Sequence, residues 1–158
     1  MKSTNIRPYK VFAIKAGTVI DHITAGHALK IVRLLNLADE NRVVTIGLNF
    51  SSKKMKLKDI IKVENRELTK EEINRVAIFA PLASINIIKD FAVIKKFRAE
   101  IPETIEYVVT CPNPKCLTNH ESITTKFHVL PKSNNIHLKC HYCEKVFLES
   151  EINEYKNA

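Results

Sequence analysis

The sequence predicts an α+β protein in two parts, on the basis of three observations. All four cysteines lie in the last third of the chain, from Cys111 to Cys143, and none lies in the first 110 residues. Before them, apolar residues recur at strand and helix spacing in the order β-α-β-β-α-β with one further strand. Between the two regions, residues 98–104 (RAEIPET) are polar with a central proline, which is typical of a domain boundary.

The chain begins with a predicted strand and a predicted helix. Residues 11–14 (VFAI) are predicted to form a short buried strand, and residues 18–23 (TVIDHI) to extend it or to form a loop. Thr24 is a candidate cap for a helix whose apolar side chains recur one turn apart. These apolar side chains are Ala28, Ile31, Val32 and Leu35.

Two strands and a second helix come next. Residues 42–49 (RVVTIGLN) and residues 57–63 are β-branched and apolar, which predicts two strands joined by a polar, lysine-rich turn. Thr69 and Glu72 match a capping box in front of an apolar stripe, and Pro81 ends the helix that they begin. The stripe consists of Ile73, Val76, Ala77 and Ala80.

A strand pair completes the first region. Residues 84–88 and 91–97 are predicted strands that meet in a tight turn at residues 89–90. Strands and helices in this order give a ferredoxin-like α/β sandwich. We therefore expect a ferredoxin-like domain over residues 1–100 and a small all-β, zinc-ribbon-like (rubredoxin-like) domain over residues 101–158.

The second region is short and has little apolar surface to bury. Residues 127–130 and 135–139 are predicted strands, and the charged residues 149–158 are expected to form a helical or frayed tail. A module of about 50 residues buries too little surface to be stable alone. A bound metal is therefore predicted to be structurally required.

The four cysteines fall into two close pairs, Cys111-x4-Cys116 and Cys140-x2-Cys143, with 23 residues between the pairs. This spacing lets two tight turns present four thiolates to one tetrahedral Zn²⁺. Four sulfur ligands close the coordination sphere, so the zinc is predicted to be structural rather than catalytic. Four histidines are alternative ligands, although surface or packing roles suit them better; they are His120, His128, His137 and His141.

The sequence carries no sign of export or membrane insertion. No stretch approaches the roughly 20 apolar residues of a transmembrane helix, and the first residues lack the apolar segment of a signal peptide. These features predict a cytoplasmic protein with no membrane partner. In a reducing compartment, close cysteine pairs are metal ligands more often than disulfides.

The net charge of +8 is unevenly distributed. Residues 1–100 hold 19 Lys and Arg against 10 Asp and Glu, a balance of +9, whereas residues 101–158 hold 6 against 7, a balance of −1. A zinc ribbon that grips phosphate backbones is basic, because counterion release supplies most of its affinity. The charge therefore argues against a nucleic-acid partner for the cysteine-rich region.

The possible small-molecule sites are limited by composition. With only three glycines, the sequence contains neither a P-loop nor a GxGxxG motif. Lysines at residues 53–62, Lys95 and Lys96 could still bind nucleotide phosphates, although such lysines are more often solvated surface charge. Asp21 and His22 could begin a catalytic relay, but no nucleophile motif completes it; a polar pair at a strand end is the alternative.

Several segments, in order over nearly the whole chain, carry a family resemblance. They are residues 17–23 (GTVIDHI), 45–49 (TIGLN), 58–65 (KDIIKVEN), 80–81 (AP) with 85–86 (IN), 111–113 (CPN) and 140–145 (CHYCEK). In this combination the chain resembles the regulatory chain of aspartate carbamoyltransferase. The resemblance implies a non-catalytic allosteric subunit and not an enzyme in its own right.

The resemblance also implies effectors and partners. In the family, a ferredoxin-like domain binds CTP as inhibitor and ATP as activator, and UTP acts alongside CTP in some members. The zinc domain contacts the catalytic chain, and paired regulatory chains bridge two catalytic trimers that carry out the first committed step of pyrimidine biosynthesis. A nucleotide that binds two quaternary states unequally would then shift the activity of the complex.

A nucleotide pocket follows from the same resemblance, residue by residue. Lys62 and Lys96 are expected to neutralise the triphosphate, and Asp21 and His22 to lie in the ribose and phosphate region. Val11, Ala13 and Ile14 are expected at the base. The remaining implied residues are Asn86, Ile88, Phe91 and Val93.

Three other functions compete with this interpretation. A nucleic-acid-binding zinc ribbon would need a basic face on the cysteine-rich region. A stand-alone metabolite sensor would differ only in lacking a catalytic partner, and an enzyme would need a nucleophile and a base that the sequence does not offer. Phe12 and Phe91 stand where the best-known family members have an acidic residue and a tyrosine, so nucleotide preference and the sign of the response stay open.

Overall fold

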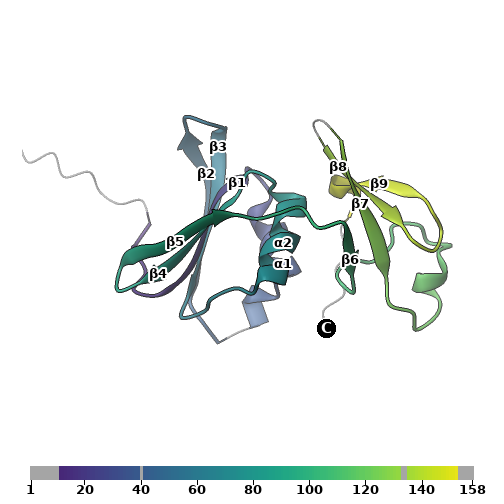
Figure 1. The fold of residues 1–158 in the computed structure, drawn as a ribbon, viewed down its shortest axis with the longest axis horizontal. Coiled ribbons are helices and arrows are strands. Elements are labelled where there is room, and N and C mark those ends of the chain that lie inside the picture. Colours follow the sequence, from purple (N-terminus) through teal and green to yellow (C-terminus); the bar gives the residue numbers. More distant parts are fainter. Residues whose placement is uncertain (1–10, 40, 133–134, 153–158) are drawn as a thin grey trace, which may run out of the picture.

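The structure, a computed structural model, describes residues 11–39, 41–132 and 135–152. These residues form two separate β-sheets, one in each half of the molecule (Figure 1). We call residues 11–98 the N-terminal part and residues 104–152 the C-terminal part.

The N-terminal part combines five strands with two α-helices. In chain order its elements are β1 (Gly17–Thr24), α1 (Ala28–Leu34), the short 3-10 helix η1 (Leu37–Asp39), β2 (Val44–Ser52), β3 (Lys56–Glu64), α2 (Lys70–Phe79), β4 (Ser84–Lys89) and β5 (Ala92–Arg98). The strands lie in the order β2-β3-β1-β4-β5, and each neighbouring pair is antiparallel. The ferredoxin-like sandwich predicted from the sequence is confirmed, with β5 as the extra strand at one edge.

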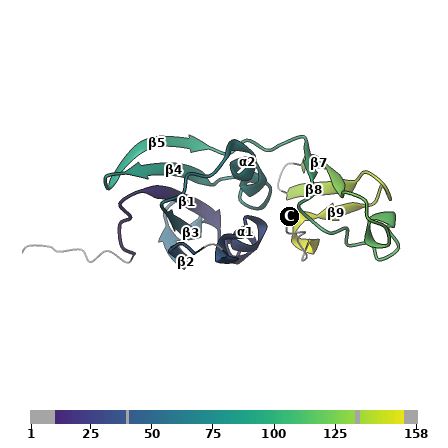
Figure 2. The same cartoon turned by 90° about the horizontal axis from the view of Figure 1, so that it is seen from below.

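The core of the N-terminal part lies between the sheet and its two helices. Both helices cover the same face of the sheet (Figure 2). Ile61, Ile20 and Ile85 lie side by side on β3, β1 and β4, and each is fully buried. Because side chains alternate between the faces of a strand, their neighbours along each strand point to the opposite, uncovered face.

Helix α2 begins and ends as the sequence predicts. The Glu72 backbone N–H donates to the Thr69 hydroxyl at 3.2 Å, and the Thr69 N–H donates to the Glu72 carboxylate at 2.9 Å. This capping box satisfies two of the backbone donors that a helix N-terminus leaves without partners. The helix ends at Phe79, two residues before Pro81.

The prediction that Thr24 caps the first helix is wrong. Thr24 is still paired in β1, and α1 begins only at Ala28, after a turn in which Gly26 has a φ of +89°. The buried carboxylate of Asp59, on β3, accepts hydrogen bonds from the N–H groups of Gly26 and Ala28 at 2.9 and 3.2 Å. A side chain distant in sequence therefore supplies the acceptor that a local cap was expected to supply.

The predicted strand over residues 11–14 is also wrong, because β1 begins at Gly17. Of these residues only Ile14 is buried, while Phe12 and Ala13 are exposed. β1 already has β3 and β4 on its two sides, and the preceding segment is held by separate contacts. Lys62 Nζ donates to the carbonyl of Phe12 at 2.6 Å, and the Phe91 N–H donates to the carbonyl of Lys15 at 3.0 Å.

The C-terminal part is a small all-β unit, as predicted. Its elements are β6 (Thr104–Glu106), the 3-10 helix η2 (Leu117–Asn119), β7 (Lys126–Lys132), β8 (Asn135–Cys140), β9 (Val146–Leu148) and the 3-10 helix η3 (Glu149–Glu151). They form an antiparallel sheet in the order β6-β7-β8-β9. Of the predicted tail, residues 149–151 form the single turn η3, and residues 153–158 lie outside the described residues.

The two parts meet on the helix side of the N-terminal sheet. Figure 1 shows α1 and α2 lying between that sheet and the C-terminal part. One cluster of buried apolar side chains extends through both parts, from Ile20 to Ile152. In the described residues, no helix is long and apolar enough to cross a membrane.

Candidate functional site

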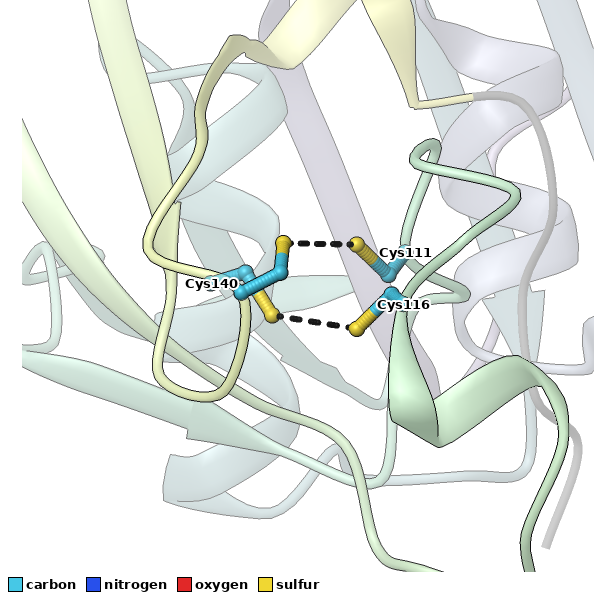
Figure 3. A group of neighbouring side chains, drawn as sticks. Cys111, Cys116 and Cys140 are labelled. Carbon is cyan, nitrogen blue, oxygen red and sulfur yellow. Dashed lines mark hydrogen bonds between the residues drawn. The ribbon is translucent and has the colours of Figure 1, made fainter.

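The four cysteines lie on two loops at one end of the C-terminal sheet. Cys111 and Cys116 lie on the loop between β6 and η2, Cys140 ends β8, and Cys143 lies in the turn before β9. Figure 3 shows Cys111 and Cys116 on one side of the cluster and Cys140 facing them from the other. Residues about 30 positions apart in sequence are thus brought to one point, as the spacing predicts.

The distances between the sulfur atoms fit a tetrahedral metal. Cys111 Sγ and Cys143 Sγ are 3.8 Å apart, as are Cys116 Sγ and Cys140 Sγ, and all four atoms lie within 4.8 Å of one another. A tetrahedron with Zn–S bonds of about 2.3 Å has edges of about 3.8 Å. A disulfide would require about 2.05 Å, so the four thiols form a ligand set and not two bridges.

Local hydrogen bonds hold the first cysteine loop in shape. The Cys116 N–H donates to the Asn113 carbonyl at 2.9 Å. The side-chain amide of Asn119 donates to the carbonyls of Cys111 and Asn113 at 2.9 and 2.8 Å. These bonds to the backbone close the loop and place Cys111 and Cys116 on the same side of the cluster.

The second loop is held in the same manner. The Cys140 N–H donates to the Lys145 carbonyl at 2.9 Å, and the Glu144 N–H donates to the Cys140 carbonyl at 3.0 Å. Glu144 takes a left-handed conformation with a φ of 60°, which reverses the chain in a tight turn. Two tight turns thus present four thiols, two from each loop.

The thiols differ in how readily they ionise. Burial raises the pKa of Cys111 and of Cys140 above the ordinary value for a thiol. Burial also raises the pKa of Cys143, but hydrogen bonds from the Asn113 side chain and the Lys145 backbone outweigh it, and the pKa of Cys143 is lowered to about 7. A metal that binds here must displace protons from the buried thiols, so its affinity should rise with pH.

The histidines of this region are engaged elsewhere or lie apart from the cluster. His120 Nε2 is 2.7 Å from the carbonyl of Pro114, and His128 Nε2 is 3.0 Å from His141 Nδ1. Among the described residues, the four cysteines are the one group of three or more potential metal ligands that converges. The alternative ligand set with a histidine therefore finds no geometric support.

The uncovered face of the N-terminal sheet carries most of the predicted nucleotide residues. Strand register places Lys62 (β3), Val19 (β1), Asn86 (β4) and Lys96 (β5) in one row across the sheet. This row alternates with the buried row of isoleucines, so it points away from the two helices. The predicted residues Ile88 and Val93 are paired with each other beside the row.

Asp21 and His22 are turned toward each other by an irregularity in β1. The register of β1 against β3 shifts between Ile20 and Ile23, and His22 has a φ of 57°. His22 Nδ1 lies 3.5 Å from an Asp21 carboxylate oxygen and 3.4 Å from the hydroxyl of Ser84. A bulge of this kind brings two consecutive side chains to one site, which regular alternation does not allow.

Lys58 links these residues to β3 and was missing from the predicted pocket. Its ammonium lies 2.8 Å from Asp21 Oδ1. Burial raises the pKa of Asp21, but the Lys58 hydrogen bond, the His22 N–H and the charges of Lys58 and His22 outweigh it and lower the pKa overall. Lys58 falls in the lysine-rich segment that the sequence singled out, but only the register pairs it with β1.

The site is strongly cationic around His22. Burial lowers the pKa of His22; the Asp21 charge opposes that shift, and the nearby charges of Lys58, Lys54 and Lys96 add to it. Burial likewise lowers the pKa of Lys62, which makes Lys62 a partly desolvated cation. Lys54, Lys58 and Lys96 therefore bring positive charge close to His22, and together with burial they favour the neutral form of its imidazole.

The remaining predicted residues lie on the adjoining N-terminal segment and the β4–β5 turn. Val11 is half-buried, Ala13 is exposed and Ile14 is buried, so the three do not present one continuous surface. Phe91 is 66% exposed at the tip of the hairpin. The hydrogen bond from Lys62 to the Phe12 carbonyl holds this segment against the row of Lys62, Val19, Asn86 and Lys96, which we call the basic row.

Comparison with known protein families identifies the two parts of the chain as known domains. Residues 9–100 match the family model of the aspartate carbamoyltransferase regulatory chain, allosteric domain, and residues 103–153 match that of its metal binding domain. The chain belongs to the aspartate carbamoyltransferase regulatory chain family. It is therefore a regulatory and not a catalytic chain, with an allosteric domain and a metal-binding domain, and the resemblance recognised in the sequence is confirmed.

Relatives named aspartate carbamoyltransferase regulatory chain match over nearly their whole length. The regulatory chain of Pyrococcus horikoshii is 48% identical over 145 residues, covering 90% of this chain and 95% of the relative. That of Phocaeicola vulgatus is 49% identical over 143 residues, covering 90% and 92%. That of Chromobacterium violaceum is 44% identical over 146 residues, covering 92% and 96%.

Proposed function

We propose that the chain binds CTP and ATP, with UTP as a third candidate, on the uncovered face of its N-terminal sheet. The observation that carries this proposal is the basic row of Lys62 and Lys96, with Lys58 and His22 beside it, on a face that no helix of the described residues covers. A triphosphate carries several negative charges, and charge-assisted hydrogen bonds from lysines are the contacts that it favours.

The parts of the nucleotide are assigned by the chemistry of the residues. The phosphates would lie along the lysines, and Asp21 with His22 would take the ribose and phosphate region. The base would lie at Val11, Ala13 and Ile14, where backbone groups can read its edge. The apolar side of the pocket would be formed by Ile88, Phe91 and Val93, with Asn86 in the row between the lysines.

We propose zinc as the metal of the C-terminal part, held by Cys111, Cys116, Cys140 and Cys143. Four thiolates in tetrahedral array favour Zn²⁺. Because no position is left for water or substrate, the metal would have a structural role. The matching sulfur–sulfur distances support this assignment.

The two roles would divide along the chain. Residues 1–100 would form the nucleotide-binding allosteric domain, and residues 101–158 the zinc domain that contacts the catalytic chain. The charge balance of −1 over residues 101–158 supports a protein partner there in preference to a nucleic acid. Free thiols at four positions suit the reducing cytoplasm, which we propose as the location.

The partners would be aspartate carbamoyltransferase catalytic trimers and a second copy of this chain. Strand β2 is an edge of the N-terminal sheet, and an unpaired edge is a ready site for another strand. Apolar side chains are exposed there, which supports a covered surface in the assembly. They are Val43, Ile46, Leu48 and, on the neighbouring β3, Leu57. Paired chains would bridge two trimers that carry out the first committed step of pyrimidine biosynthesis.

The nucleotide would act by binding two quaternary states with different affinity, because a ligand with equal affinity for both shifts nothing. Occupancy would change the shape of the regulatory pair or the angle between its domains. Phe12 and Phe91 border the site, and they leave the preference among nucleotides and the sign of the response to experiment.

The test is Lys62→Ala in the chain assembled with its own catalytic trimers. The substitution removes one of the two cations of the basic row, so we expect the nucleotide effect on the aspartate response to be abolished while the complex stays assembled. Nucleotide affinity, measured by calorimetry, should fall by roughly ten- to a hundredfold. Lys132→Ala, at an exposed position on β7 of the other sheet, is the matched control. A full response to CTP and ATP in Lys62→Ala would show that the pocket is misassigned.

A further inference from the structure

Three charged or ionisable side chains meet where the N-terminal and C-terminal parts contact each other. His27 Nε2 lies 3.8 Å from Glu149 Oε1, and Lys30 Nζ lies 3.9 Å from Glu149 Oε2. His27 and Lys30 come from the start of α1, and Glu149 begins η3. We call these three residues the clasp. Figure 2 shows η3 on the side of the C-terminal part that faces α1.

The imidazole of His27 also joins the two helices. Its Nδ1 donates to the carbonyl of Phe79, the last residue of α2, at 2.5 Å. A carbonyl can only accept, so Nδ1 carries the hydrogen and the Nε2 edge of the ring is turned toward Glu149. One side chain thus contacts α2 on one edge and the C-terminal part on the other.

Glu149 is held in place from its own side. The Ile152 N–H donates to the Glu149 carbonyl at 3.2 Å, and the Ile152 side chain is fully buried. The Glu149 side chain is 18% exposed, and its Oε2 is buried and accepts no hydrogen bond from the described residues. Such an oxygen depends on the nearby cation of Lys30 for compensation, because desolvating a carboxylate is costly.

A continuous set of contacts connects the clasp to the basic face of the sheet. On β3, Lys58 pairs with Asp21, and the next residue, Asp59, is fully buried. The Asp59 carboxylate accepts the N–H groups of Gly26 and Ala28, the residues on either side of His27. A shift of Lys58 or Asp21 would therefore move Asp59, and the hydrogen bonds of Asp59 would pass the movement to the turn that positions His27.

We propose that His27, Lys30 and Glu149 are positioning residues that couple the effector face to the orientation of the metal-binding part. The clasp closes or opens as the β1–α1 turn moves, and it thereby provides the two-state element that coupling between distant sites requires. This inference rests on the proposed function, since it concerns how occupancy of the nucleotide site reaches the catalytic partner. A surface ion pair without any role in coupling is the alternative.

The first experiment does not depend on nucleotide binding. In the zinc-loaded full chain, hydrogen exchange of the Ile152 amide is measured for the wild type, Lys30→Gln, Glu149→Gln and the double variant. The clasp predicts exchange roughly two- to fivefold faster in each single variant and no further gain in the double variant. Glu121→Gln, an exposed acidic position of the C-terminal part, should leave the rate unchanged. Unchanged exchange in all variants would overturn the clasp itself.

The second experiment tests the coupling in the complex with the catalytic trimers. Glu149→Gln should retain assembly and nucleotide affinity, but the nucleotide-induced shift in half-saturating aspartate should shrink roughly two- to fivefold. The double variant with Lys30→Gln should lose no more than either single variant. If the wild type and Glu149→Gln show the same nucleotide-induced shift, the coupling role is overturned, while the proposed function stands. A wild type with no response would overturn the proposed function, and the exchange rates would still decide the clasp.

Discussion

The N-terminal and C-terminal parts are both built on antiparallel sheets, but they are stabilised by different means. The N-terminal sheet buries one face under two helices, and its isoleucine row on β3, β1 and β4 is fully buried. The C-terminal sheet has four strands, two of only three residues, and the described residues of this part contain no α-helix of their own. Its loops converge instead on four thiols. Buried apolar side chains therefore contribute to both parts, but in the described residues only the C-terminal part adds a cluster of potential metal ligands.

The largest difference between the two parts should appear on metal removal. A chelator, or Cys140→Ser, should unfold residues 104–152 while the N-terminal part stays folded, because only the C-terminal part contains the ligands. Structural zinc in small modules contributes about 10 kcal/mol or more of binding free energy that is also folding free energy. Hydrogen exchange resolved along the chain measures this. Equal loss of protection in both parts would mean that they fold as one unit.

The next largest effect concerns the covered face of the N-terminal sheet. Ile20→Ala on the central strand should lower the free energy of unfolding by about 2–5 kcal/mol, since it leaves a cavity under the helices. Val93→Ala on the uncovered face, where the side chain is 57% exposed, should cost no more than about 0.5 kcal/mol. Urea unfolding of the zinc-loaded chain compares the two. Similar losses of unfolding free energy in Ile20→Ala and Val93→Ala would contradict the assignment of one buried and one exposed face.

The smallest effect comes from the ion pair of Asp21 with Lys58. Because the pKa of Asp21 is lowered in the folded chain, its ionised form stabilises the fold above its ordinary pKa of 3.8, and this contribution is lost as the pH falls through the folded-state pKa. The free energy of unfolding of the wild type should exceed that of Asp21→Asn by less than about 1 kcal/mol near pH 6, and this difference should shrink below about pH 4. Urea unfolding at several pH values gives the difference. A gain that grows in acid would contradict the lowered pKa.

The sequence was sufficient for the features that depend on local pattern. The capping box of Thr69 and Glu72 follows from residues three apart, and both contacts are present. The spacing of the cysteines fixes two tight turns, and the sulfur atoms converge as expected. The fold class could be predicted as well, because the spacing of apolar residues distinguishes strands from helices and so gives the order of the elements.

Features that depend on contacts between residues far apart in the chain could not be predicted from the sequence. The strand predicted at residues 11–14 is wrong because β1 begins only at Gly17, and the segment before it is held by contacts with Lys62 and Phe91, which no local pattern reveals. Thr24 fails as a cap because Asp59, 35 positions later, accepts the N–H groups of the turn. Val19 and Lys58 were missing from the predicted pocket since only the strand register places them beside Lys62 and Asp21.

The central claim is that a metal-dependent C-terminal part docks this chain onto catalytic trimers while the N-terminal part binds the effector. Sedimentation of the zinc-loaded chain mixed with the aspartate carbamoyltransferase catalytic trimer of the same organism, repeated after zinc removal, tests it most directly. We predict a larger complex with zinc that disappears without it, while the metal-free chain still binds nucleotide. A complex of the same size in both states would contradict metal-dependent docking, and no complex in either state would contradict the proposed partner.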